Sequence, residues 1–111
     1  MGLDQKILTR IMTYCAQAEH CTQDVIQKLV AWEVTEEDMD GIVEKLRSEK
    51  YLDDTRFAQS FVNDKWKLDQ WGRAKIRNGL FQKGISEPLI QSALDTIDQD
   101  AYISIMENLL E

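Results

Sequence analysis

The sequence predicts an all-α protein, in which tandem three-helix repeats stack into a curved, elongated array. Three observations support this prediction. The 111 residues include 1 Pro and 5 Gly, which are too few breakers for the turns of an all-β chain. Apolar residues recur at spacings of three and four, as on the buried face of an amphipathic helix. The same apolar pattern returns after 51 residues, which indicates an internal repeat.

The first predicted helix runs from about Asp4 to Ala18. Its apolar residues share one face at helical spacing: Leu3, Ile7, Ile11, Tyr14, Cys15 and Ala18. The second predicted helix is short and has Thr22 as its N-cap, because a threonine hydroxyl can accept from an unpaired N–H of the first turn. Its expected inward side chains are Val25, Ile26, Leu29 and Val30.

The third predicted helix begins after Thr35, where Asp38 three residues later resembles a capping box. It ends near Tyr51 and Leu52, and its expected inward side chains are Met39, Ile42, Val43 and Leu46. Carboxylates in its first turns fit the positive end of the helix dipole. We interpret this acidic run as structural, with partner recognition or cation binding as the alternative: Glu36, Glu37, Asp38 and Asp40.

The second half of the chain repeats this plan. Asp53 and Asp54 can cap a fourth helix, whose expected inward side chains are Phe57, Ala58, Phe61 and Val62. Gly72 separates this helix from a fifth, which has Ile76 and Leu80 inward. The fifth helix should stop at Gly84, because glycine adopts the left-handed conformation past a helix end without strain.

Ser86 is the expected N-cap of a sixth helix, and Pro88 fits its first turn because an N–H there lacks an intrahelical acceptor. The inward side chains of the sixth helix should be Leu89, Ile90, Ala93, Leu94 and Ile97. Helical spacing then continues to the last residues, through Ala101, Tyr102, Ile105, Met106, Leu109 and Leu110.

An offset of 51 aligns the apolar residues of the two halves, although the first helix of each half aligns less well. The aligned pairs are Val25 with Ile76, Leu29 with Leu80, Val34 with Ile85, Met39 with Ile90, Val43 with Leu94 and Leu46 with Ile97. We therefore expect a first repeat over 1–51 and a second over 52–98. Residues 99–111 are expected to be the first helix of an incomplete third repeat.

The composition argues against several classes of protein. A formal net charge of −7 counts against a protein that coats nucleic acid. No apolar run approaches the roughly 18 residues of a membrane span, and the first residues lack a signal-peptide pattern, so a cytoplasmic location is expected. One histidine, with neither a Gly-rich phosphate loop nor a nucleophile elbow, indicates a protein that is not an enzyme and needs no cofactor.

A metal site is not expected either. The nearest candidate ligands are Cys15, His20 and Cys21, but Cys15 belongs to an apolar stripe and no fourth ligand is evident. We interpret these three residues as buried or loop residues.

Charge is distributed unevenly along the chain. Residues 64–83 contain six Lys or Arg and two Asp, a net charge of +4, which leaves −11 for the other residues. Arg73 and Arg77 lie one turn apart on the fifth predicted helix, where they could present two guanidinium groups to phosphate or carboxylate. The alternative is a solvated helix face. Trp71, next to this segment, could stack on a base, although packing is the more common role of a Trp in a helical array.

Three segments resemble the RecX family of bacterial recombination regulators: LDDTRFAQSFV at 52–62, WGRAKIRNGLFQKGIS at 71–86 and PLIQSAL at 88–94. The matching positions are largely structural. They include Leu52, Asp53, Asp54, Phe57, Ala58, Gly72, Ile76, Leu80, Gly84 and Ile85. One departure is Gly79, where the family commonly has an acidic residue.

The resemblance implies three tandem three-helix repeats without catalytic activity. It implies binding to RecA recombinase and its filament on DNA, with inhibition of the ATPase, strand-exchange and SOS co-protease activities, and it leaves room for weak direct contact with DNA. We expect the partner- or phosphate-binding residues to be Lys65, Arg73, Lys75, Arg77 and Lys83. The alternatives are a general DNA-binding helical module and a helical-repeat scaffold for protein interactions.

Overall fold

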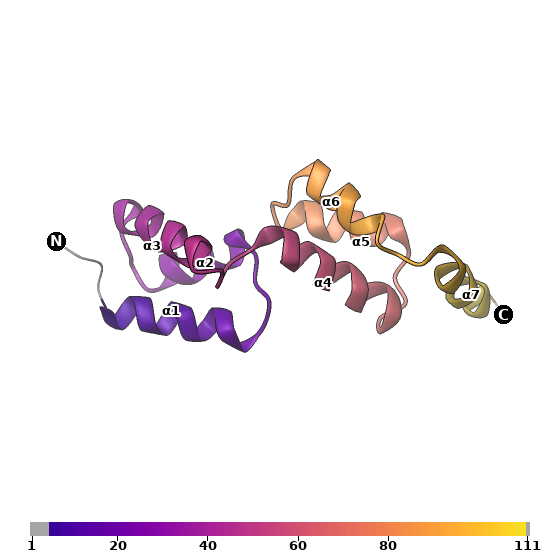
Figure 1. The fold of residues 1–111 in the computed structure, drawn as a ribbon, viewed down its shortest axis with the longest axis horizontal. Coiled ribbons are helices and arrows are strands. Elements are labelled where there is room, and N and C mark those ends of the chain that lie inside the picture. Colours follow the sequence, from indigo (N-terminus) through magenta and orange to yellow (C-terminus); the bar gives the residue numbers. More distant parts are fainter. Residues whose placement is uncertain (1–4, 111) are drawn as a thin grey trace. The chain divides into compact units, whose positions relative to one another are not determined.

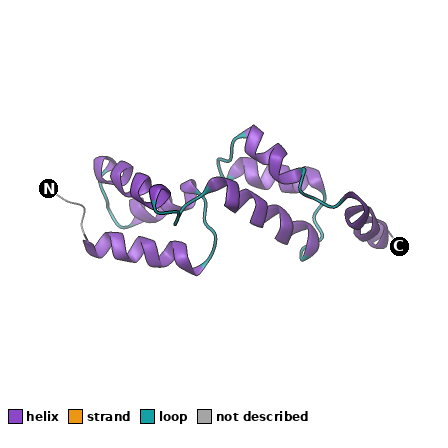
Figure 2. Ribbon diagram, viewed as in Figure 1, coloured by secondary structure: helices purple, strands orange, loops and turns teal. Residues whose placement is uncertain are grey.

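A computed structural model describes residues 5–110, which form seven helices and no strand (Figure 1; Figure 2). The all-α prediction is therefore confirmed for this part of the chain. The chain divides into two compact units, residues 1–54 (unit 1) and 55–111 (unit 2). The predicted inward positions of Leu3, and of the side chains of Met106, Leu109 and Leu110, lie outside what the structure describes.

Unit 1 contains α1 (Gln5–Gln17), α2 (Thr22–Ala31) and α3 (Glu36–Ser48). Their apolar faces meet in one core, formed by Leu8, Ile11, Cys15, Val25, Leu29, Ile42, Val43, Leu46 and Leu52. The predicted inward positions of Ile26 and Val30 are wrong, because these side chains are 39% and 56% exposed. Each follows a core residue and so lies about 100° further around the helix, beyond the edge of the buried stripe.

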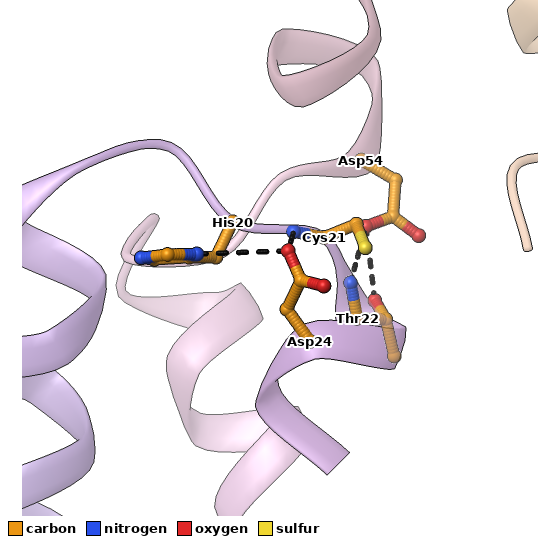
Figure 3. Close-up of polar contacts among 5 residues, drawn as sticks. All are labelled: His20, Cys21, Thr22, Asp24 and Asp54. Atoms are coloured by element: carbon orange, nitrogen blue, oxygen red, sulfur yellow. Dashed lines mark hydrogen bonds and ion pairs between the residues drawn. The ribbon is translucent and has the colours of Figure 1, made fainter. Parts of the chain in front are cut away.

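The N-cap of α2 is Cys21, and the prediction that Thr22 has this role is wrong. Thr22 is the first helical residue, and both its backbone N–H and its hydroxyl donate to Asp54 Oδ1, over 2.8 and 3.1 Å (Figure 3). The Asp24 carboxylate reaches back to accept from the Cys21 N–H, at 3.4 Å (Figure 3). Asp54, expected to cap the fourth helix, thus accepts from an N–H at the start of α2 that has no acceptor within its own helix.

The next helix, α4 (Asp54–Lys67), begins at this aspartate and leads into unit 2, where α5 (Arg73–Gln82), α6 (Glu87–Leu94) and α7 (Gln99–Leu110) follow. The core of unit 2 includes Phe57, Ala58, Val62, Trp66, Ile76, Leu80, Ile85, Ile90, Ala93, Leu94 and Ile97. Ile97 is buried as expected, but it lies beyond α6. The Thr96 hydroxyl donates to the Ala93 carbonyl at 2.6 Å, within the turns that follow the helix.

The repeat seen in the sequence is exact at the second helix, because an offset of 51 carries both ends of α2 onto those of α5. The N-caps Thr35 and Ser86 are related by the same offset, as are Glu33 and Gly84, which have φ angles of 61° and 77° after the second helix of each unit. Gly84 therefore adopts the predicted left-handed conformation. The offset also relates the buried residues Ile11 and Val62, and Cys15 and Trp66, so the first helices align at their core positions.

Candidate partner-binding surface

Two of the predicted binding residues line one cavity of unit 2. Arg73 begins α5 and Arg77 follows one turn later, which brings both to a cavity of about 360 Å³ between α5 and α6, which we call the arginine cavity. Gln91 of α6 and Asp95, the C-cap of that helix, line the same cavity, together with Gln99 of α7. The helical spacing of the two arginines therefore places them together.

The Arg73 guanidinium has neutral partners. Its Nη2 donates to Gln99 Oε1 at 2.8 Å, and its Cζ lies 4.3 Å from the centre of the Tyr102 ring. The Tyr102 hydroxyl also accepts from the Arg73 backbone N–H at 3.0 Å, which is the first N–H of α5. Because neither Gln99 nor Tyr102 carries a formal charge, the positive charge of Arg73 is oriented but not neutralised.

Arg77 is held by one neutral and one charged partner. Its Nη2 donates to Gln91 Oε1 at 2.6 Å, and its Nη1 forms an ion pair with Glu87. The Arg77 side chain is 37% exposed, so solvent weakens this ion pair to the range of about 0–1 kcal/mol typical of surface pairs. A stronger anionic partner could displace Glu87 at little cost. Glu87, Gln91 and Gln99 were not predicted from the sequence to be partners of these arginines.

A second group of cations surrounds an indole ring, and we call Lys65, Trp71 and Lys75 the Trp71 cluster. The Nζ atoms of Lys65 and Lys75 lie 4.7 and 4.4 Å from the centre of the Trp71 ring. Lys65 is half-buried, and its Nζ forms an ion pair with Asp69 Oδ2 at 3.0 Å. Lys75 is exposed. The Trp71 backbone N–H donates to the Lys65 carbonyl at 2.9 Å, which folds the loop back onto the end of α4. Cation–π contacts at exposed sites contribute about 0.5–1 kcal/mol each.

Gly79 provides the space beneath this cluster. A Cβ at this position would lie 2.9 Å from Phe61 Cζ and 3.5 Å from Trp71 Cζ3. The two rings meet edge to face, with their centres 6.2 Å apart. A glycine inside a helix costs about 1 kcal/mol relative to alanine, and here it allows two aromatic rings to approach the α5 backbone.

Lys83, the last of the predicted binding residues, is the C-cap of α5 and is half-buried. Its backbone N–H donates to the carbonyls of Gly79 and Leu80, at 3.2 and 3.1 Å. Lys83 lies neither in the Trp71 cluster nor among the residues that line the arginine cavity.

The possible metal ligands of unit 1 make other contacts. The His20 ring stacks on Tyr14 with centres 3.8 Å apart, and its Nδ1 lies 3.6 Å from Asp24 Oδ2 (Figure 3). Over residues 5–110, no group of three His, Cys, Asp or Glu side chains is placed to hold a metal ion. In the same part of the chain, no helix has the length and apolarity needed to cross a bilayer.

Residues 53–94 match the second three-helix domain of RecX. The regulatory protein RecX of Chlorobium phaeobacteroides is 32% identical to this chain over 99 residues, which cover 89% of this chain and 66% of that protein. The chain belongs to the RecX family. It is also 31% identical to the regulatory protein RecX of Leuconostoc mesenteroides, over 94% of this chain and 39% of the relative.

Solved RecX structures share the fold. A crystal structure of regulatory protein RecX matches with a TM-score of 0.86 and 30% identity, covering 94% of this chain and 52% of that one. The RecX of Lactobacillus salivarius matches with the same TM-score at 21% identity, over 94% of this chain and 68% of that one. The chain thus spans between about two fifths and two thirds of the length of these RecX relatives.

Most of the residues that match RecX, which we call the RecX motif, are buried: Leu52 in the core of unit 1 and the other buried ones in unit 2. The apolar motif residues are all buried: Leu52, Phe57, Ala58, Ile76, Leu80 and Ile85. Gly72 is the N-cap of α5, and a Cβ there would lie 3.5 Å from the Tyr102 hydroxyl. The RecX motif therefore positions α4, α5 and α6, while the cations between the motif residues supply the chemistry of the surface.

Proposed function

We propose that this RecX-family chain is a non-catalytic regulator that binds RecA recombinase or its filament on DNA. It inhibits the ATPase, strand-exchange and SOS co-protease activities of RecA in the cytoplasm and needs no cofactor. The similarity to proteins named regulatory protein RecX supports the regulatory role. RecA and its filament on DNA offer both carboxylates and phosphates, which are suitable partners for a cationic surface.

The observation that carries this proposal is the pair of cationic groups in unit 2. Arg73 and Arg77 line one cavity, and Lys65 and Lys75 approach one indole ring. Partner contacts orient the long side chains before binding, so less conformational entropy is lost when an anion arrives. We propose that these four residues, with Lys83, contact the acidic surface of RecA or the phosphates of its filament.

We propose the repeat boundaries 1–51, 52–98 and 99–111. The contacts of α7 support its assignment as the first helix of a third repeat. In unit 1, the first N–H of α2 donates to Asp54, the first residue of α4. In unit 2, the first N–H of α5 donates to Tyr102, in the first turn of α7. The helix that follows each repeat thus caps the second helix of that repeat.

The test is RecA-dependent ATP hydrolysis on single-stranded DNA, titrated with the chain and its variants. We expect Lys65→Gln/Lys75→Gln to raise the concentration for half-inhibition about tenfold, since each lost charge pair is worth up to about 1 kcal/mol. The matched control is Lys45→Gln/Lys50→Gln in unit 1, which changes the net charge equally and should inhibit like the unmodified chain. Full inhibition by a folded Lys65→Gln/Lys75→Gln variant would refute the proposed contacts.

The Trp71 cluster also favours a second candidate function, a general DNA-binding module, because lysines beside an indole ring can hold phosphates and a stacked base. Fluorescence anisotropy with single- and double-stranded DNA, without RecA, separates the two. Binding that weakens steeply with salt would favour the general module. Association that requires RecA favours the regulator.

A further inference from the structure

Unit 1 has a groove at the position equivalent to the arginine cavity of unit 2. This groove, of about 480 Å³, lies between α2 and α3, and we call it the acidic groove. An offset of 51 carries its residues Ile26, Asp40 and Glu44 onto Arg77, Gln91 and Asp95, which all line the arginine cavity. The two grooves thus share a place in the repeat, but their chemistry differs.

Three carboxylates line the acidic groove at regular intervals, against one cation, Arg47, so the charged lining is predominantly acidic. Glu36, Asp40 and Glu44 are four residues apart along α3, which places them on one face at steps of about 6 Å. All three are exposed, and none makes an ion pair or a side-chain hydrogen bond with another residue of the described part of the chain. Their charges therefore remain available, unlike that of Arg77, which has a partner in Glu87.

Apolar side chains accompany this row of carboxylates. Ile26 of α2 and Met39 and Val43 of α3 line the groove, and Ile26 is substantially exposed. Val30, one turn further along α2, is more exposed still. Ile26 and Val30, which were predicted to point inward, therefore give α2 an exposed apolar edge.

We propose that the acidic groove binds a basic amphipathic helix of a partner protein. A helix lying along α3 could place Lys or Arg side chains one turn apart, at the same steps of about 6 Å as the three carboxylates. Its apolar side chains would cover Ile26 and the exposed part of Met39, which removes apolar surface from water. The acidic groove has the opposite charge to the arginine cavity and the Trp71 cluster of unit 2, so these surfaces select different ligands.

The test uses a fluorescent helical peptide of about 18 residues, with Lys one turn apart along one edge and Leu beside them. Its affinity is measured by anisotropy at about physiological ionic strength. Asp40→Asn/Glu44→Gln should weaken binding about tenfold. The matched control is Glu33→Gln/Glu37→Gln, which makes the same change in charge at exposed residues outside the groove and should change affinity less than about twofold.

A second pair of variants tests the apolar part of the groove without changing any charge. Ile26→Ser should weaken peptide binding about fivefold, whereas Leu68→Ser, at an exposed leucine of unit 2, should leave it unchanged. Equal losses for the groove and control variants would overturn the proposal, since they would indicate attraction to the net charge alone. Self-association that Asp40→Asn/Glu44→Gln abolishes would also overturn it, because the occupant would then be a second copy of the chain.

Discussion

Replacement of Gly79 by alanine tests whether the rings beneath the Trp71 cluster require a glycine. A new Cβ would lie 2.9 Å from Phe61 Cζ and 3.2 Å from Phe61 Cε1, well inside the optimum carbon separation of about 3.5–4.0 Å. The Phe61 ring would have to move by roughly 0.5 Å or more. It is confined by Phe57 and Trp71, whose ring centres lie 5.8 and 6.2 Å away.

Two opposing effects set the size of the change. Alanine is favoured over glycine inside a helix by about 1 kcal/mol. Overpacking typically costs about 1–3 kcal/mol, so Gly79→Ala should leave the stability of unit 2 unchanged or lower it by up to about 2 kcal/mol. In a Phe61→Ala background the obstructing ring is absent, and the same substitution should stabilise unit 2 by about 1 kcal/mol. The coupling between the two sites is thus about 1–3 kcal/mol.

Urea unfolding followed by tryptophan fluorescence measures this coupling in the full chain. Trp32 belongs to unit 1, whereas Trp66 and Trp71 belong to unit 2. A Trp32→Phe background makes the signal specific for unit 2, and the four chains of the double-mutant cycle are compared in that background. A gain of about 1 kcal/mol from Gly79→Ala with Phe61 still present would refute the reasoning, because the ring would then not obstruct a Cβ.

Two further substitutions test the caps that join each repeat to its next helix. Tyr102→Phe removes the acceptor of the Arg73 N–H but keeps the ring beside Trp66. It should cost about 1 kcal/mol and speed amide exchange at Arg73, and unchanged protection of this amide would contradict the cap. Asp54→Ala leaves the N–H and the hydroxyl of Thr22 without their acceptor. It should lower the stability of unit 1 by about 1–2 kcal/mol, measured by Trp32 fluorescence, whereas equal stability would show that water replaces the carboxylate.

The helices and their ends could be predicted where the signals are local. Gly84 and Ser86 are examples, because a left-handed residue and an N-cap act within a few positions of the chain. The contacts that satisfy the first N–H of α2 and of α5 were not predictable in this way. Thr22 and Asp54 are 32 residues apart, and Arg73 and Tyr102 are 29 apart. Sequence spacing does not show which acceptor the fold brings to a helix end.

The same limit applies to the edges of the apolar faces. Periodicity correctly placed Val25 and Leu29 in the core of unit 1, but it also placed Ile26 there. A pattern defines the centre of an apolar stripe, whereas the width of the stripe that becomes buried depends on the neighbouring helices. Likewise, the spacing of Arg73 and Arg77 showed that they share a face, but not that Gln99 and Glu87 would hold them.

The internal repeat explains how a small chain can present unlike surfaces at equivalent places. Core positions related by the offset of 51 are both apolar, as Val25 and Ile76 are, because each residue must fill the core of its own unit. Residues of the groove are free of that constraint, so Arg77 stands at the position equivalent to Ile26, and Gln91 at that of Asp40. The second helices still have equivalent bounds, and the third helices begin at equivalent residues. A ligand attracted by its charge to one of the two grooves is therefore disfavoured by the other. A partner that occupied both would need a basic segment for the acidic groove and an acidic or phosphate-bearing segment for the arginine cavity.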